Sequence, residues 1–231
     1  MSIFGNIIKS TETIDRENRM LKSADQTPFS AKLAKGRAQK VLPPLKQPNA
    51  ALRSREYLTF HEIVALQKAA RKAGRQGQRD QTLILIAFRH ALRVGELVAL
   101  KWDQVDLKVG LLHVKRLKNG LPSTHPVRGI ELRALKTLKR SHPDAPYVFM
   151  SERGAPLSDR TVRQIVARAG EQANLGFTVH PHMLRHSTGF YLANKGEDTR
   201  AIQSYMGHAN IKNTVIYTEL SPQRFNRFWN D

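Results

Sequence analysis

Residues 180–187, in the last quarter of the chain, read HPHMLRHS. Pro181 suits the first position of a helix, because its fixed φ is already helical and its missing N–H would be unpaired there. His182 and Arg185 are three residues apart, so a helix places both on one face. The first turn of a helix also offers free backbone amides to an anion. The stretch therefore predicts a helix that presents an imidazole and a guanidinium to a phosphate, although a surface arginine beside capping histidines is the alternative.

The sequence on either side predicts mostly helices. Thr59-Phe60-His61-Glu62 forms a capping box that begins a helix. The apolar run 83–88, with its flanks, is too long for a strand and predicts a buried helix over 79–92. Further helices are expected over 94–100, 130–138, 158–169, 198–206 and 210–220. Strand patterns occur at 111–114 and 123–127, around a turn at 118–120, so the expected fold class is mainly α with a small antiparallel β-sheet (α+β).

The composition favours a polyanionic partner. The 231 residues carry 38 Lys and Arg against 19 Asp and Glu, a formal net charge of +19. Such an excess attracts nucleic acid through steering and counterion release, although a basic ribosomal accessory protein would share it. The absence of cysteine excludes disulfides, thiolate catalysis and any Cys-ligated metal. No secretory signal or membrane span is found, so we expect a cytoplasmic, nucleoid-associated protein.

The first 56 residues differ from the rest. They are expected to form a basic N-terminal arm and linker, partly disordered, ahead of a catalytic domain over 57–231. Residues 22–55 hold eight basic side chains and one acid. Five of the cations are candidate contacts to DNA: Lys32, Lys35, Arg37, Lys40 and Lys46. A solubilising tail is the alternative.

Four further residues are candidates for phosphodiester chemistry. Arg93 lies at a helix break in an apolar region, where a buried guanidinium must meet a carboxylate such as Glu96 or a substrate anion. His208 follows a helix-ending glycine in a loop that can direct it into a cleft. Tyr217 alone is compatible with a half-buried core residue, and Lys118 with a solvated turn lysine. Two guanidinium groups, two imidazoles and a phenol can nevertheless hold a phosphodiester and attack it without a metal.

A zinc site is the main competing interpretation of the histidines. His182 and His186 are four residues apart, as in the helix of a zinc protease. That helix needs a glutamate beside the first histidine, and Met183 stands there instead. The sequence therefore predicts no metal and no cofactor.

The combined motifs resemble the catalytic domain of the tyrosine recombinase (lambda-type integrase) family. Residues 91–97 resemble its first signature box, and residues 180–187, 202–208 and 214–218 resemble the later ones. The amino-acid sequence around residues 180–194 is similar to that of the short fimbrial phase-switch invertases. The resemblance covers residues 57–217 and implies a site-specific recombinase that cleaves and rejoins DNA through a 3′-phosphotyrosine, without metal or ATP. A type IB topoisomerase-like relaxing enzyme and a catalytically silent DNA-binding regulator are the alternatives.

The resemblance also implies roles for six residues. Tyr217 would be the nucleophile, and Arg93 and Arg185 would hold the scissile phosphate. His182 would assist proton removal from the phenol, and His208 would bind the phosphoryl group. Lys118 would protonate the leaving 5′ oxygen, with neighbouring Lys115 and Arg116 as alternatives.

The expected partners follow from the same resemblance. They are double-stranded DNA, a homotetramer on two DNA sites, and a directionality or architectural protein. Many members of the family carry a separate helical core-binding domain ahead of the catalytic one, whereas the residues before 57 are too few and too polar to form it. We therefore expect DNA affinity to depend on the catalytic domain and the basic arm.

Overall fold

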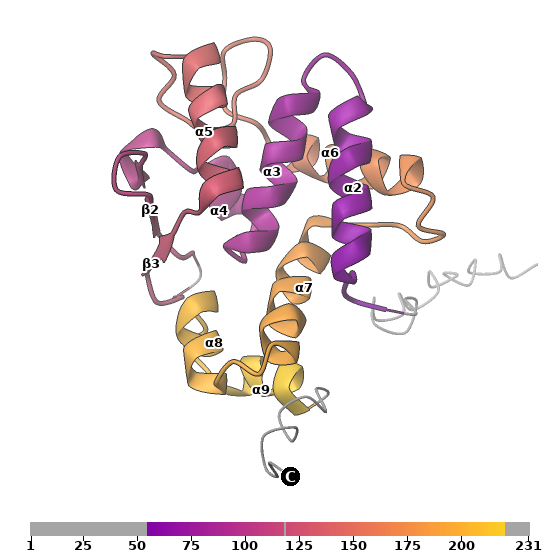
Figure 1. Ribbon diagram of the computed structural model, residues 1–231, viewed down its shortest axis with the longest axis vertical. Helices are drawn as coiled ribbons and strands as arrows, with labels where there is room; N and C mark the ends of the chain where they lie inside the picture. Colours follow the sequence, from indigo (N-terminus) through magenta and orange to yellow (C-terminus); the bar gives the residue numbers. More distant parts are fainter. Residues whose placement is uncertain (1–54, 118, 220–231) are drawn as a thin grey trace, which may run out of the picture. The chain divides into compact units, whose positions relative to one another are not determined.

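The computed structural model describes residues 55–117 and 119–219, and helices dominate this part of the chain (Figure 1). Three short strands form one antiparallel sheet. The mainly helical α+β class predicted from the sequence is therefore confirmed. The helices are α2 (Phe60–Lys72), α3 (Gly77–Arg89), α4 (Val94–Val98), α5 (Gly129–Ser141), α6 (Asp159–Gln172), α7 (Pro181–Asn194), α8 (Thr199–Met206) and α9 (Lys212–Glu219), with one 3-10 turn, η2 (Trp102–Gln104).

Local signals in the sequence fix the ends of the helices. The Thr59 side chain accepts from the Glu62 amide, and the Glu62 carboxylate accepts from the Thr59 amide at 2.7 Å, so the predicted capping box begins α2. Ser158 and Asp198 cap α6 and α8 by accepting from the amide three residues further on. Helix α8 ends at Gly207, whose φ of 65° lies in the left-handed region that favours glycine. The chain therefore turns sharply just before the loop that follows α8.

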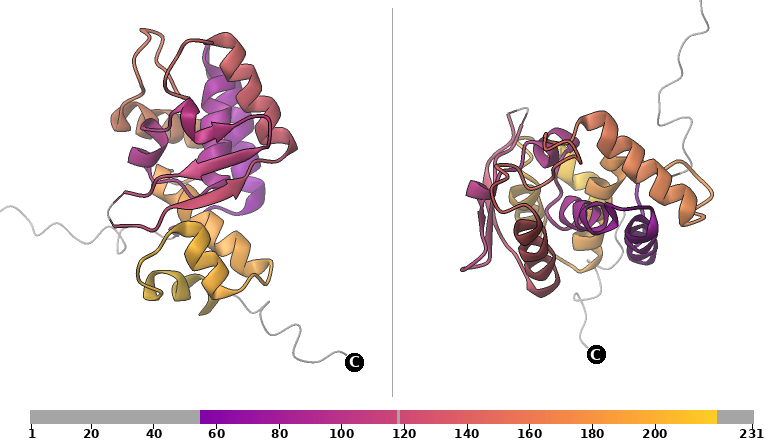
Figure 2. Two further views of the ribbon diagram at one scale, coloured as in Figure 1. Left: turned by 90° about the vertical axis from the view of Figure 1, so that its left-hand side faces the viewer. Right: turned by 90° about the horizontal axis from the view of Figure 1, so that it is seen from above.

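The sheet contains β1 (Val105–Asp106), β2 (Leu111–Val114) and β3 (Ser123–Pro126), paired in that order. Leu112 lies opposite His125 in the β2–β3 ladder. The sheet forms one side of the domain, where the left panel of Figure 2 shows it face on. The hairpin between β2 and β3 reaches toward α8, and α8 contacts β3. The sheet thus delivers the tip of this hairpin to the end of α8.

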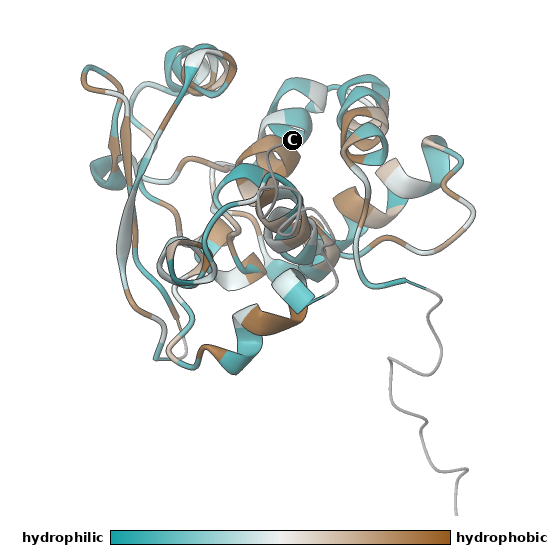
Figure 3. Cartoon of the chain, turned by 60° about the horizontal axis from the view of Figure 1, so that its bottom comes forward, coloured by the Kyte–Doolittle hydropathy of each residue, from teal (hydrophilic) through white to brown (hydrophobic). Residues whose placement is uncertain are grey.

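The main core surrounds α3. Its run Leu83, Ile84, Leu85, Ile86, Ala87 and Phe88 is buried on every side, which confirms the predicted buried helix. Helices α2, α5 and α7 pack directly against α3, and α6 packs against α2. Seen from above, the sheet and α6 lie at opposite edges of the domain (Figure 2). Apolar and polar residues alternate around the helices as expected for amphipathic elements (Figure 3).

A second, smaller core joins the three C-terminal helices. Its buried residues are Ala91, Ala193, Ile202, Met206 and Tyr217. Helix α7 contacts both α8 and α9, which lie together at the lower end of the domain in Figure 1. The position of Tyr217 therefore depends on the packing of α7, α8 and α9. Among the described helices, none combines the length and the apolar character needed to cross a membrane.

Candidate active site

Arg93 is held in the turn between α3 and α4. The Glu96 carboxylate accepts from the Arg93 amide at 2.9 Å and from its Nη1 at 2.7 Å, so the arginine meets the carboxylate that the sequence indicated. Nη1 also donates to the Leu117 carbonyl at 3.3 Å. The side chain keeps 24% of its surface exposed. Glu96 and the Leu117 carbonyl thus hold Arg93 in place, while part of its side chain remains exposed to solvent.

Arg185 is almost completely buried in α7, with 2% of its surface exposed. Its Nη1 donates to the Ala91 carbonyl, and its Nη2 donates to the Met206 carbonyl at 2.8 Å. Ala91 adopts a φ of 50°, which is uncommon outside glycine and turns its carbonyl toward the arginine. Burial, followed by repulsion from Arg93 and Arg116, lowers the pKa of Arg185 to about 9. The guanidinium still carries its charge at neutral pH, and neither acceptor neutralises it.

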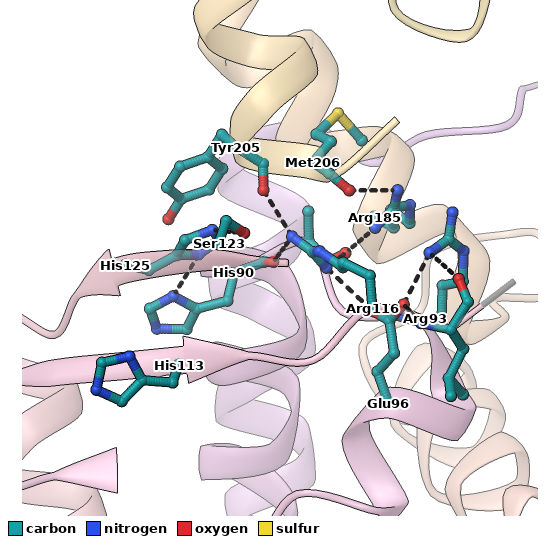
Figure 4. Close-up of polar contacts among 12 residues, drawn as sticks. His90, Arg93, Glu96, His113, Arg116, Ser123, His125, Arg185, Tyr205 and Met206 are labelled. Carbon is teal, nitrogen blue, oxygen red and sulfur yellow. Dashed lines mark hydrogen bonds and ion pairs between the residues drawn. The ribbon is translucent and has the colours of Figure 1, made fainter. Parts of the chain in front are cut away.

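Three guanidinium groups and one carboxylate meet at this point (Figure 4). Glu96 binds Arg93 through Oε1 and Arg116 through Oε2, the second at 3.0 Å. Burial opposes the ionisation of Glu96, but hydrogen bonds from Arg93 and the charge of Arg116 lower its pKa. With Arg185 included, three positive charges minus one negative charge leave an excess of +2. Because a buried charge is costly without a partner, this cluster favours a bound anion.

Tyr217 lies in α9 with only 2% of its surface exposed. Its phenol is hydrogen-bonded to His186 Nδ1 at 2.9 Å. Its ring rests on Gly189, where an added Cβ would lie 2.6 Å from two ring carbons. Burial raises the pKa of Tyr217 to about 12, against a smaller opposing effect of the nearby arginines. The phenol is therefore packed, oriented and un-ionised in this structure.

Of the two predicted histidines, His208 contacts Tyr217 directly and His182 contacts its partner His186. His208 Nδ1 and Thr214 Oγ1 are 2.8 Å apart, and the imidazole stacks on the Tyr217 ring at a centroid distance of 6.4 Å. Burial, then repulsion from the arginines, lowers the pKa of His208 to about 4, so the ring is neutral at pH 7. His182 is exposed in the first turn of α7, and its ring meets the edge of His186 at 4.4 Å. His182 thus lies against His186, which in turn is hydrogen-bonded to the Tyr217 phenol.

The structure brings together five of the six predicted catalytic residues around α7: Arg93, His182, Arg185, His208 and Tyr217. Lys118 lies outside the described residues, but its hairpin reaches the cluster. The amide of the preceding residue, Leu117, donates to Glu96 at 3.1 Å. The five predicted arm cations, between residues 32 and 46, also lie outside the described residues.

Sequence reasoning missed two residues of this site. His186 was considered only as a zinc ligand, yet it holds the Tyr217 phenol. Arg116 was considered only as a substitute for the hairpin lysine, yet its side chain is fully buried. A usable signal existed for Arg116. Side chains alternate between the two faces of a strand, and inward-facing Leu112 and Val114 place Arg116 on the buried side.

A buried chain of polar groups secures β3 beside the site (Figure 4). Ser123 Oγ lies 2.9 Å from His125 Nε2, and His125 Nδ1 lies 3.1 Å from His90 Nδ1. His90 Nε2 faces Glu131 Oε1 at 2.9 Å. Burial, then the charges of His90 and a neighbouring arginine, lowers the pKa of His125 to about 3. This chain ties the hairpin strand to α3 and α5, and in the described ranges no three His, Asp or Glu side chains come close enough to hold a metal ion.

A helical domain with a small sheet, and with arginines, histidines and a tyrosine gathered around one helix, defines the class of tyrosine site-specific recombinases. The chain belongs to the phage integrase family, whose pattern matches residues 56–224. Site-specific DNA recombination is the activity of that family.

Individual relatives support this assignment. The chain is 42% identical to the type 1 fimbriae regulatory protein FimB of Escherichia coli K12 over 182 residues, which cover 77% of this chain and 90% of that protein. It superposes on XerA recombinase with a TM-score of 0.67 and 26% identity, over 84% of this chain and 70% of XerA. A lambda integrase dimer bound to a COC′ core site gives a TM-score of 0.59 and 25% identity, over 79% of this chain and 53% of that chain.

Proposed function

We propose that this protein cleaves and rejoins double-stranded DNA through a 3′-phosphotyrosine formed on Tyr217, without a metal ion or ATP. The observation that carries the proposal is the excess of positive charge around Arg185, on the same helix that supports the Tyr217 ring. A scissile phosphate is the anion that this arrangement would accept. The DNA-bound state of the related lambda integrase supports the choice of ligand.

In this scheme the Tyr217 oxygen attacks phosphorus and the bond to the 5′ oxygen breaks. The phenol loses its proton, the 5′ oxygen gains one from Lys118, and the phosphodiester becomes a phosphotyrosine of similar energy. Attack by a 5′ hydroxyl reverses these changes, so resealing requires no external energy source. Arg93 and Arg185 stabilise the charge that builds on the non-bridging oxygens, since preorganised donors act most strongly in the transition state.

The resting position of Tyr217 requires a rearrangement before attack. A buried phenol with a pKa near 12 is a poor nucleophile at neutral pH. We propose that His186 holds the phenol at rest and that DNA binding draws Tyr217 toward the arginine-bound phosphate. His182, exposed beside His186, then assists removal of the proton, and His208 binds the phosphoryl group.

The remaining parts of the proposal concern the assembly. The cations at 32, 35, 37, 40 and 46 contact DNA phosphates from a basic arm that precedes a catalytic domain over 57–231. Strand exchange requires two DNA sites and is performed by a homotetramer, and a directionality or architectural protein sets the outcome. The net charge of +19 supports extensive contact with DNA.

The deciding experiment uses nicked suicide DNA, which traps the covalent intermediate because the cleaved end diffuses away. Tyr217→Phe should bind this DNA and form no adduct, since only the phenolic oxygen is lost. Tyr147→Phe, a change of the same kind at a half-buried tyrosine that lies against Lys101, should form adduct normally. A normal adduct yield from Tyr217→Phe would refute the assignment of the nucleophile.

The same assay separates the alternative functions. A catalytically silent regulator would trap nothing even with the unaltered chain. A topoisomerase-like enzyme would form the adduct and relax supercoiled DNA without exchanging strands between two duplexes. Strand exchange between two labelled duplexes is the result expected here.

A further inference from the structure

Arg116 lies at the centre of the cluster and binds four acceptors (Figure 4). Its Nη1 donates to the Ala91 carbonyl at 3.1 Å and to Glu96 Oε2 at 3.0 Å. Its Nη2 donates to the His90 carbonyl at 3.2 Å and to the Tyr205 carbonyl at 2.6 Å. These acceptors belong to the end of α3, to α4 and to the end of α8. One side chain from the hairpin therefore joins three separate segments of the site.

The stem of Arg116 is enclosed by two glycines. A Cβ added to Gly120 would lie 2.8 Å from Arg116 Cβ and 2.9 Å from the Gly207 carbonyl oxygen. A Cβ added to Gly207 would lie 2.7 Å from Arg116 Cγ and 2.6 Å from the Leu121 carbonyl oxygen. The hairpin and the turn after α8 thus approach each other backbone to backbone, with Arg116 between them. No other residue type at 120 or 207 would leave this space.

Arg116 cannot itself serve as a phosphate ligand in this arrangement. Its side chain has no exposed surface, and both terminal nitrogens are already donating to two acceptors each. Its effect must pass through the groups that it holds. Each of these groups lies within three residues of Arg93 or His208 in the sequence, and Lys118 lies two residues from Arg116 along the hairpin.

We infer that Arg116 is a positioning residue that holds the Lys118 hairpin in register with the Arg93 turn and the His208 loop. The inference rests on the proposed function, in which Lys118 protonates the leaving 5′ oxygen. A guanidinium suits this task because its planar fork reaches several acceptors at fixed angles, whereas a lysine ammonium is a flexible point charge. Arg116→Lys should therefore keep the positive charge but no longer hold the hairpin in its position beside the Arg93 turn and the His208 loop.

The test compares DNA with the normal 5′ oxygen leaving group and DNA with sulfur in its place. A thiolate leaves without a proton, so the sulfur substrate does not need the general acid. Arg116→Lys should slow adduct formation on the oxygen substrate by about 10²-fold, the size expected for a small misplacement of a catalytic group. Most of that loss should disappear on the sulfur substrate. Arg163→Lys, at an exposed arginine of α6, is the matched control and should react normally on both.

Each outcome decides the matter. An equal loss on both substrates would show that Arg116 acts through the arginines that hold the phosphate, or through folding. No loss on either substrate would show that Arg116 does not position the hairpin. Either result overturns the inference. If Arg116→Lys is rescued by sulfur and Lys118→Ala is not, the hairpin supplies the acid from another residue and only the role of Lys118 fails. If Lys118→Ala is rescued and Arg116→Lys is not, the inference alone fails.

A second variant covers a failure of Arg116→Lys to fold. Gly120→Ala keeps every hydrogen-bonding group, but its added methyl group would lie 2.8 Å from Arg116 Cβ and so displace the stem of the arginine. It should show the same pattern, slow on oxygen and rescued by sulfur. Gly120→Ala that reacts normally on the oxygen substrate would overturn the inference without any change to the arginine.

Discussion

At the scale of single residues, Arg93 and Arg185, which we propose to clamp the scissile phosphate, are held in different ways, and their loss should have different effects. Arg93→Ala and Arg185→Ala should each slow adduct formation by about 10²–10³-fold, as for other preorganised transition-state donors. Arg185→Ala should also destabilise the fold by about 1–3 kcal/mol, because it leaves the Met206 carbonyl buried without its donor and removes one of the two donors to the Ala91 carbonyl. Single-turnover kinetics and thermal unfolding separate the two effects, with Arg163→Ala as the control.

The same reactions should proceed in a metal chelator. Activity that is lost in EDTA and restored by magnesium or zinc would contradict the metal-free scheme. A clamp arginine whose replacement leaves the adduct rate unchanged would contradict its assignment.

His125 predicts how stability depends on pH. The ring is 1% exposed and faces His90, Tyr205 and the charge of Arg116. Its pKa is about 3 in the folded chain, against 6.5 for the free side chain, so only the unfolded chain takes up a proton between these values. The contribution of His125 to the free energy of unfolding is therefore fully present above pH 6.5. It decreases as the pH falls, by up to about 1.4 kcal/mol per pH unit. Denaturant unfolding from pH 7 to 5 should show a shallower slope for His125→Asn, whereas His113→Asn, exposed on the same sheet, should leave the slope unchanged.

The sequence predicted the residues that the structure gathers around α7, but it did not predict the side chains that support them. Arg93, Arg185 and Tyr217 were predictable because their residue types and order match the chemistry of a phosphodiester. Strand alternation could have marked Arg116 as buried, but the partners that give Arg116 and His186 their places in the site lie 89 and 31 positions away. Such long-range partners depend on tertiary packing, which local patterns do not contain.

At the scale of elements, the contact between α7 and α9 sets the position of Tyr217, the proposed nucleophile. Gly189→Ala would place a methyl group 2.6 Å from the Tyr217 ring, so either the ring or α9 must move. Overpacking of this kind costs about 1–3 kcal/mol. We expect a lower unfolding temperature and a changed adduct rate. Gly129→Ala is the matched control, because its nearest neighbour is a flexible arginine tip at 3.7 Å.

An unfolding temperature of Gly189→Ala equal to that of Gly129→Ala would show that α9 adapts freely. In that case the contact with Gly189 on α7 would not fix the position of Tyr217. The adduct rate of the two variants should then also agree.

The helices were easier to predict than the strands. The Thr59 capping box and the helix-ending Gly207 are local signals that stand where the sequence indicated, and Ser158 and Asp198 cap the helices expected from residues 158 and 198. The two-residue strand β1 was not assigned, because its pairing with β2 creates it. A segment this short has no periodicity of its own.

At the scale of the whole molecule, the basic arm should contribute affinity rather than specificity. Deleting residues 1–50 should weaken DNA binding and flatten its salt dependence, by about 0.9 in the log–log slope for each DNA phosphate that the arm had neutralised. Sequence preference should change less, since phosphate contacts position a protein while base contacts specify the site. Binding titrations at several salt concentrations measure the slope, and thermal unfolding should show that the domain from residue 57 stays folded. An unchanged slope would make the arm a passive tail.

The main-chain acceptors of the arginine cluster have a consequence for evolution and engineering. Apart from Glu96, the acceptors that hold Arg93, Arg116 and Arg185 within the described part of the chain are backbone carbonyls, including those of Ala91, Leu117 and Met206. A carbonyl survives any substitution that preserves the path of the chain. Genetic drift at these positions can therefore proceed while the geometry of the clamp persists. Mutagenesis that retargets this protein to new DNA sites can therefore vary the side chains at these positions without removing the carbonyl acceptors, whereas Gly120 and Gly207 must be kept.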